Sequence, residues 1–235
     1  MRRLAATLCL TLAVLLGSAG VSVSQDFMKG VDAYNRGDYA TALREWTPLA
    51  EQGIAGAQSN LGLMYRRGDG VPPDYATAMK WYTLAAEQGH ASAQYNLGLM
   101  YVNGDDVPQD YKTAMKWYTL AAEQGNADAQ YNLGFMYDNG YGVPQDDKTA
   151  LKWWTLAAEQ GNADAQTSLG VMYYNGEGVL QDYVYAHMWW NIAASSGNKN
   201  ASENRDIVAK RMTPADISAA QDLARECVKK NYKGC

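Results

Sequence analysis

The feature that most constrains this chain is a block of residues that recurs at a fixed period. The residues from Ala91 to Gly125 reappear, largely unchanged, from Ala127 to Gly161, which is an offset of 36 residues. The same frame holds from Ala55 to Gly89 and from Ala163 to Gly197. A unit of this length cannot bury a hydrophobic face alone, whereas stacked copies can share one continuous core. The period therefore predicts a repeat architecture.

Each copy is predicted to form two helices. In the copy that contains Gly98, the apolar residues of the first helix fall on one helical face, and they are Ala93, Leu97, Met100 and Tyr101. The second helix carries small and aromatic residues at helical spacing, namely Ala114, Trp117, Tyr118, Ala121 and Ala122. Asn103-Gly104 is suited to end the first helix and Gly125 to end the second. Asp110 stands where a helix N-cap is expected, and Asn126 can cap the next copy.

A glycine recurs inside the first helix of every copy, at Gly62, Gly98, Gly134 and Gly170. A glycine in a helix interior costs about 1 kcal/mol relative to alanine, so its recurrence indicates that another helix approaches closely. We expect the recurring alanine pairs at 85–86, 121–122 and 157–158 to make this approach. The recurring tryptophans are expected to fill the space between helices, and they are Trp81, Trp117, Trp153 and Trp189.

The two ends of the chain depart from the repeat. Residues 25–53 form a shorter version of the unit, with about five loop residues fewer. The four full repeats are assigned to 54–89, 90–125, 126–161 and 162–197. Residues 198–235 are predicted to form two capping helices, the second starting at Thr213 and Pro214. The fold class expected from this organisation is all-α, with stacked antiparallel helix pairs.

Residues 1–24 have the three-part layout of a secretory signal peptide. Arg2 and Arg3 give a basic start, residues 4–16 carry no charge, and Ser22 and Ser24 flank a cleavage site after Ser24. Cleavage after Ala19 and an uncleaved anchor are the alternatives. No later apolar stretch reaches the roughly 20 residues that span a bilayer. We therefore expect a periplasmic or secreted protein without stable membrane insertion after cleavage.

Composition and motifs give no support for catalysis, metal binding or nucleic-acid binding. The formal net charge is -5 and no basic patch stands out, which argues against a nucleic-acid partner. His90 and His187 are the only histidines, and neither has a partner at metal-ligand spacing. Asp105, Asp106 and Asp110 do not form a calcium loop. No G-x-S-x-G motif is present in residues 25–235, and no catalytic, metal or cofactor residue is assigned.

Cys227 and Cys235 are the two cysteines that remain after signal cleavage. An even number of cysteines in an oxidising compartment suggests a disulfide. A continuous helix through Cys235 would hold the two sulfurs about 12 Å apart along its axis, so a bridge requires the chain to turn back after about Tyr232. Gly234 permits that turn. We predict a disulfide that fixes the C-terminal tail.

The repeat unit resembles the Sel-one-like repeat (SLR) family, which is related to the tetratricopeptide repeats. The resemblance covers residues 54–197, while residues 25–53 are more similar to a tetratricopeptide unit. In the first copy the motif is carried by Gln58, Leu61, Gly62, Tyr65, Gly68, Gly70, Val71, Asp74, Ala78, Trp81, Ala85, Ala86 and Gly89, and it recurs in the three later copies. The departures are Asp106 for a loop glycine, Leu180 for a loop proline, and Ser195-Ser196 for Glu-Gln.

The resemblance implies a right-handed superhelix with a concave groove, and an adaptor that assembles protein complexes. One cysteine-rich bacterial branch of the family is linked to β-lactams and cell-wall chemistry, but it carries a disulfide within its repeats. This chain has no cysteine between Phe27 and Glu226, which weakens that link. The first helix of each pair is expected to line the groove.

Positions that vary between copies on the first helix are the best candidates for partner binding. The candidates that we select are Tyr95, Asn96, Tyr131, Asn132, Asp138 and Tyr174. Tyrosine is frequent at binding hot spots, although these tyrosines can equally fill gaps between helices. The favoured function is an exported scaffold that binds a protein or peptide in the groove. The alternatives are a cell-wall-associated or β-lactam-binding or hydrolysing protein, and a secreted effector.

Overall fold

The computed structural model describes residues 23–235, and every regular element in that part of the chain is a helix. The chain divides into two compact units, 1–97 and 98–235, and the division falls inside α5 (Ala91–Asn103). Each unit is described by itself. The signal-peptide prediction concerns residues 1–24, and residues 1–22 lie outside the described residues.

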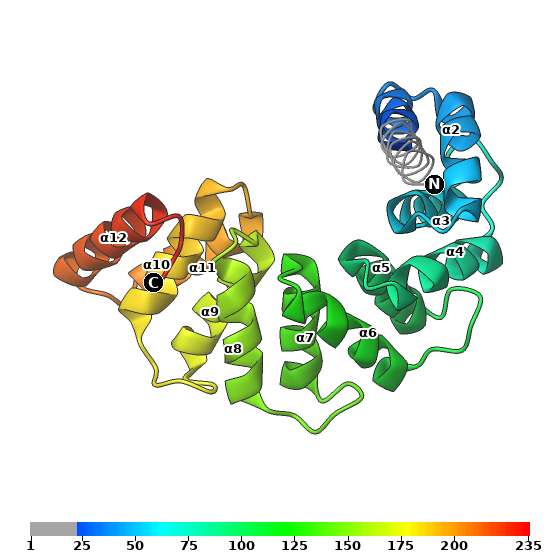
Figure 1. The fold of residues 1–235 in the computed structure, drawn as a ribbon. Coiled ribbons are helices and arrows are strands. Elements are labelled where there is room, and N and C mark those ends of the chain that lie inside the picture. Colours follow the sequence, from blue (N-terminus) through cyan, green and yellow to red (C-terminus); the bar gives the residue numbers. More distant parts are fainter. Residues whose placement is uncertain (1–22) are drawn as a thin grey trace, which may run out of the picture. The chain divides into compact units, whose positions relative to one another are not determined.

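The first unit begins with a helix over residues 23–35. It continues with α2 (Tyr39–Glu51), α3 (Ala55–Arg67), α4 (Tyr75–Glu87) and the first part of α5. The second unit contains the rest of α5, then α6 (Tyr111–Glu123), α7 (Ala127–Asn139), α8 (Asp147–Ala158), α9 (Ala163–Asn175), α10 (Tyr183–Ser195), α11 (Lys199–Ala209) and α12 (Pro214–Lys229). Figure 1 shows these helices following one another along the chain.

Consecutive helices pack in pairs, as in α3 with α4, α7 with α8, and α9 with α10. Successive pairs also pack through α8 and α9. Ala93, Leu97 and Met100, three of the four residues predicted for the buried face of α5, are at most 1% exposed. The predicted all-α solenoid of stacked helix pairs is confirmed.

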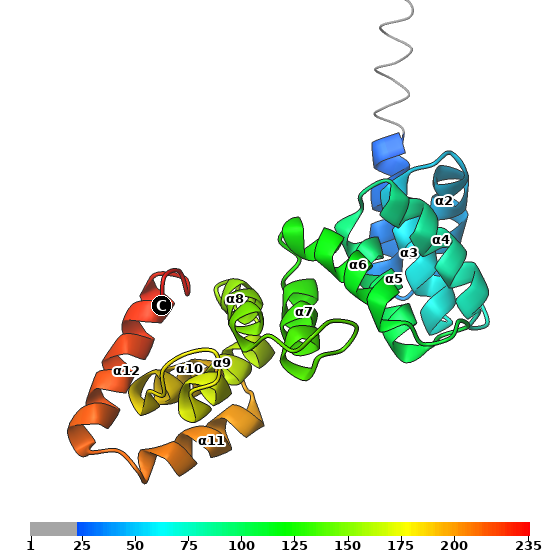
Figure 2. The ribbon, with the colours of Figure 1, turned by 90° about the horizontal axis from the view of Figure 1, so that it is seen from below.

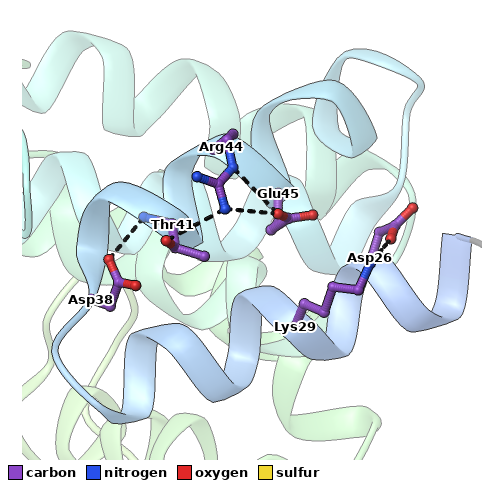
Figure 3. Close-up of polar contacts among 6 residues, drawn as sticks. All are labelled: Asp26, Lys29, Asp38, Thr41, Arg44 and Glu45. Carbon is purple, nitrogen blue, oxygen red and sulfur yellow. Dashed lines mark hydrogen bonds and ion pairs between the residues drawn. The ribbon is translucent and has the colours of Figure 1, made fainter.

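An aspartate caps the second helix of every repeat. The carboxylate of Asp110 accepts hydrogen bonds from the backbone nitrogens of Lys112 and Thr113 at 3.0 and 3.1 Å. The equivalent caps are Asp74, Asp146 and Asp182. Each cap satisfies backbone donors that the first turn of a helix leaves free. Figure 3 shows the related cap of α2, where Asp38 accepts from Thr41, together with the Arg44–Glu45 and Lys29–Asp26 ion pairs.

An aromatic ring, not the alanine pair, lies against the recurring mid-helix glycine. A Cβ atom on Gly98 would lie 2.7 Å from the ring of Tyr118. The same relationship joins Gly62 to Tyr82, Gly134 to Trp154, and Gly170 to Trp190. The prediction that the alanine pairs make the close approach is wrong, because the residue that follows the recurring tryptophan points its ring at the glycine.

The recurring tryptophans are therefore less buried than predicted in three of the four repeats. Trp81, Trp117 and Trp153 are half-buried, and a lysine on the same helix lies over each ring, as Lys116 does over Trp117 at 5.2 Å from the ring centroid. Trp189 alone among the four is buried.

A glutamine in the first helix of each repeat joins that repeat to the preceding one. The side-chain nitrogen of Gln130 donates to the carbonyl oxygen of Ala122 at 3.0 Å. The same bond joins Gln58 to Ala50, Gln94 to Ala86, and Gln166 to Ala158. These glutamines are at most 5% exposed. Each therefore provides the hydrogen bond that water would otherwise donate to a carbonyl oxygen near the end of a helix.

Helices α11 and α12 and the tail after them form the C-terminal end of the second unit (Figure 2). Thr213 and Asp216 form a reciprocal capping box at the start of α12. The Sγ atoms of Cys227 and Cys235 lie 2.05 Å apart, at disulfide distance. The tail between them turns back through positive φ angles at 231, 232 and 234, as the bridge prediction requires. Its Gly234 nitrogen donates to the carboxylate of Glu159 at 3.0 Å.

Within residues 23–235, no helix is both long and apolar enough to cross a bilayer.

Candidate partner-binding surface

Two hollows flank the side chain of Phe135 on α7. The first has a volume of about 150 Å³ and is mostly apolar. Its lining consists of Leu99, Val102, Tyr111, Tyr118, Asn132, Phe135, Met136 and Tyr141. The second has a volume of about 220 Å³. It is lined by Tyr131, Phe135, Asp138, Trp154, Ser168, Val171, Met172 and Glu177. We call these two hollows together the Phe135 surface.

The Phe135 surface exposes aromatic rings. Phe135 is 43% exposed and Tyr141 is 37% exposed. The Tyr141 ring stacks on Tyr111 with ring centroids 4.9 Å apart, and it lies 5.8 Å from the Phe135 ring. Gly142 makes this stack possible, because its φ of 76° brings it against the backbone of Tyr111, where a Cβ atom would lie 2.9 Å from the carbonyl. Exposed aromatic rings beside hollows are typical of protein-binding surfaces.

The second hollow also contains carboxylates. Burial, together with the nearby negative charges of Asp147 and Glu177, raises the pKa of Asp138. Asp138 lies in the last turn of α7, where the helix dipole also disfavours an anion. No three His, Cys, Asp or Glu side chains of residues 23–235 lie close enough together to hold a metal ion.

The structure brings three of the six predicted partner-binding residues to the Phe135 surface. Tyr131 and Asp138 line the second hollow, and Asn132 lines the first. Tyr131 is half-buried and its carbonyl accepts the indole N–H of Trp154 at 3.1 Å, so part of its role is structural.

The other three predicted residues lie elsewhere. Tyr174 stacks on Tyr183 at 5.4 Å between ring centroids, and Arg211 lies over its ring at 5.3 Å. It therefore packs within the C-terminal part of the second unit. Tyr95 and Asn96 lie on the part of α5 that belongs to the first unit, where Asn96 accepts a hydrogen bond from Arg66 at 3.3 Å.

Our sequence analysis missed Phe135 and Tyr141. The signal for Phe135 was available, because Leu63, Leu99, Phe135 and Val171 occupy one position in the four copies and vary as the selected positions do. Phe135 is also one of only two phenylalanines in the chain. Tyr141 lies in a loop, and periodicity does not reveal which loop residue folds back on a helix.

A third hollow lies between α10 and α12 and has a larger volume, about 480 Å³. Its cationic side chains, Arg225 and Lys229, already pair with Asp222 and Glu226 on the same helix. It has no exposed aromatic ring in its lining. We therefore place the candidate site at the Phe135 surface, where the exposed aromatic rings and the carboxylates lie.

The two histidines have separate structural settings. The Nδ1 atom of His90 accepts from the backbone nitrogen of Ala93 at 3.3 Å, as expected for a residue at a helix start. His187 is 3% exposed in α10, and burial together with the charge of Arg205 lowers its pKa. Its Nδ1 atom has no hydrogen-bond partner among the described residues.

The stacked helix pairs and the open surface on them define a helical-repeat scaffold. The Sel1 repeat model matches residues 55–90, 91–126, 127–162 and 163–198, which together make up more than half of the chain. The protein belongs to the Sel1 repeat family. The Sel1 repeat is a scaffold type and not a catalytic one, and its members commonly bind other proteins.

Solved structures support this assignment. The c5321 protein, a protective antigen present in uropathogenic Escherichia coli strains and displaying an SLR fold, is 35% identical with a TM-score of 0.83. The match covers 89% of this chain and 46% of c5321, so the chain spans a little under half of that relative. A Sel1 repeat protein from Oxalobacter formigenes is 33% identical with a TM-score of 0.76, and 88% and 83% of the two chains are covered.

A more distant neighbour shares the fold alone. The immunity protein PA5088 from Pseudomonas aeruginosa is 20% identical with a TM-score of 0.53, over 86% of this chain and 83% of that one. No curated protein matches the sequence.

Proposed function

We propose that this protein is an exported, non-enzymatic scaffold that binds a segment of another protein on the Phe135 surface. The observation that carries the proposal is the exposure of Phe135 between two hollows, with Tyr141 beside it. A partner that covers an exposed aromatic side chain removes apolar surface from water, and this burial favours binding. The sequence of residues 1–24 supports export to the periplasm or beyond the cell.

The proposal keeps part of the groove that the family resemblance implies. The first helices of three repeats, α5, α7 and α9, contribute to the surface, together with residues of α6 and α8 and of the loops after α7 and α9. The sequence analysis expected a partner to contact the first helix of each repeat, at positions that vary between the copies. Tyr131, Asn132 and Asp138 keep their proposed binding role, while Tyr174 is better explained by packing against Tyr183.

Affinity capture with residues 25–235 as bait tests the proposal. The baits are the native protein, Phe135→Ala, and the matched control Leu156→Ala. Leu156 is 37% exposed on the neighbouring helix α8 and lies outside both hollows. Both changes place alanine in a helix and remove exposed apolar surface, so both baits are expected to stay folded.

A protein from envelope or culture-medium fractions that binds the native and Leu156→Ala baits, but not the Phe135→Ala bait, supports the scaffold. Capture that is equal with all three baits contradicts the Phe135 surface as the site. The alternatives of a cell-wall or β-lactam protein and of a secreted effector have separate readouts. Hydrolysis of a chromogenic β-lactam by the purified protein supports the first, and delivery of the protein into a host cell supports the second.

A further inference from the structure

The second hollow of the Phe135 surface combines an apolar wall with uncompensated carboxylates. Phe135, Val171 and Met172 supply apolar surface, and Asp138 and Glu177 supply negative charge. Such a site can hold an apolar side chain and a cation of one ligand at the same time.

The loop after α9 holds Glu177 near the other acids. Gly178 has a φ of 67°, and a Cβ atom there would lie 2.6 Å from the carbonyl oxygen of Asp147. This contact fixes the loop against the first turn of α8 and places Glu177 beside Asp147. Asp138 and Glu177 both line the hollow, and the negative charges of Asp147 and Glu177 both act on Asp138.

Asp138, Asp147 and Glu177 form no direct ion pair with a lysine or arginine in the part of the chain that the structure describes. Among residues 23–235, the observed ion pairs include none of the three carboxylates. Asp138 accepts only from Asn139 at 3.3 Å, and Asp147 accepts from Gln145 at 3.0 Å. Among residues 23–235, no group of three or more His, Cys, Asp or Glu side chains could hold a metal ion. The cation of a lysine or arginine side chain can pair with such carboxylates.

We infer that the segment bound on the Phe135 surface carries a lysine or arginine within a few residues of an aliphatic or aromatic anchor. The anchor lies against Phe135 in the apolar hollow, and the cation lies between Asp138 and Glu177. This inference rests on the proposed function and adds the chemistry of the partner to it. A second copy of this chain and an anionic partner are the competing occupants.

Selection of peptides from a random 12-residue phage library on immobilised residues 25–235 tests the inference. Three enriched peptides are then synthesised with a fluorescent label, and their Kd values are measured by anisotropy. The variants are Phe135→Ala, Leu156→Ala, Asp138→Asn/Glu177→Gln, and Glu123→Gln/Glu203→Gln. The last pair removes the same charge at two exposed glutamates outside both hollows.

We expect the enriched peptides to share a basic residue near an apolar one. Asp138→Asn/Glu177→Gln should weaken their binding about 5- to 30-fold, as expected for two partly exposed charge contacts. Phe135→Ala should weaken it by roughly 30-fold or more. The two control variants should leave the Kd within about two-fold, and added salt should weaken binding to the native protein.

Two results overturn the inference, and only the first of them leaves the proposed function standing. The first is a set of peptides that require Phe135, lack basic residues and bind the Asp138→Asn/Glu177→Gln variant as tightly as the native protein. The second is a native protein that dimerises by light scattering and becomes monomeric with Phe135→Ala. In a third result, binding of the enriched peptides does not depend on Phe135. That result would contradict both the inference and the Phe135 surface as the binding site.

Discussion

The indole ring of Trp154 occupies the space that a side chain at Gly134 would fill. A Cβ atom on Gly134 would lie 2.4 Å from Cδ1 and Nε1 of that ring. The indole N–H donates to the carbonyl oxygen of Tyr131, one turn earlier on the same helix as the glycine, at 3.1 Å. The contact thus fixes the spacing of α7 and α8, and with it the floor of the Phe135 surface.

Gly134→Ala should destabilise the second unit despite the better helix propensity of alanine. Overpacking typically costs about 1–3 kcal/mol, and the gain in propensity of about 1 kcal/mol offsets part of that cost. Thermal unfolding followed by circular dichroism should show a lower Tm. In a Trp154→Ala background the same change should be neutral or stabilising. A Tm loss of equal size in both backgrounds would rule out the steric explanation.

Ser196→Gln should stabilise the fourth repeat. The side-chain oxygens of Gln58 and Gln130 each accept from a glutamine 30 residues later, at 2.7 Å. In the fourth repeat that later position is Ser196, and the oxygen of Gln166 is buried without a partner among the described residues. Supplying the donor should raise the unfolding free energy by about 0.5–1.5 kcal/mol. Ser196→Ala is the control, and an equal gain with alanine would contradict the hydrogen-bond account.

Asp138→Asn should raise the stability at neutral pH. The pKa of Asp138 is raised in the folded protein, so its ionised form is disfavoured there relative to the unfolded chain. The penalty is present in full above the folded pKa and disappears as the pH falls through the folded and then the unfolded pKa. The Tm of the variant should therefore exceed that of the native protein at pH 7 and equal it at about pH 3. A Tm difference that does not change with pH would contradict this assignment.

Cys235→Ser should lower the stability of the C-terminal end. A bridge that closes a loop between residues 8 apart in sequence is worth about 2.5 kcal/mol in the chain-entropy model. The tail contacts of Gly234 with Glu159 and of Tyr232 with Gly161 should be lost with it. Reducing agent should lower the Tm of the native protein and leave the variant unchanged. Alkylation of both thiols in native, unreduced protein, detected as added mass, would show that the bridge does not form.

The sequence was sufficient to predict what depends on spacing alone. The period, the helix pairs and the aspartate caps such as Asp110 follow from positions along the chain, because a cap and a buried face each need a fixed offset. The choice between Trp117 and Tyr118 as the ring against Gly98 depends on the rotation of one helix about its axis. A shift of one residue corresponds to a turn of about 100° around the helix. The helix keeps an apolar face whether Trp117 or Tyr118 lies against Gly98, so the sequence pattern does not choose between them.

The candidate site was predictable only in part, for a related reason. Asn132 and Asp138 stand on a regular helix, and the variation between copies identified them. Tyr141 reaches Tyr111 through a loop whose path is set by Gly142, and no periodic pattern specifies such a path. Glu177 comes near Asp138 through a second loop of the same kind.

Photo-crosslinking at position 135 is the most direct test of the central claim, that another protein covers the Phe135 surface. A photoreactive phenylalanine analogue replaces Phe135 in one strain and Leu156 in a second, and intact cells are irradiated. The account predicts a discrete protein adduct from position 135 and none from position 156. An adduct from position 156 alone, or none from either position in cells that contain the folded protein, would contradict it.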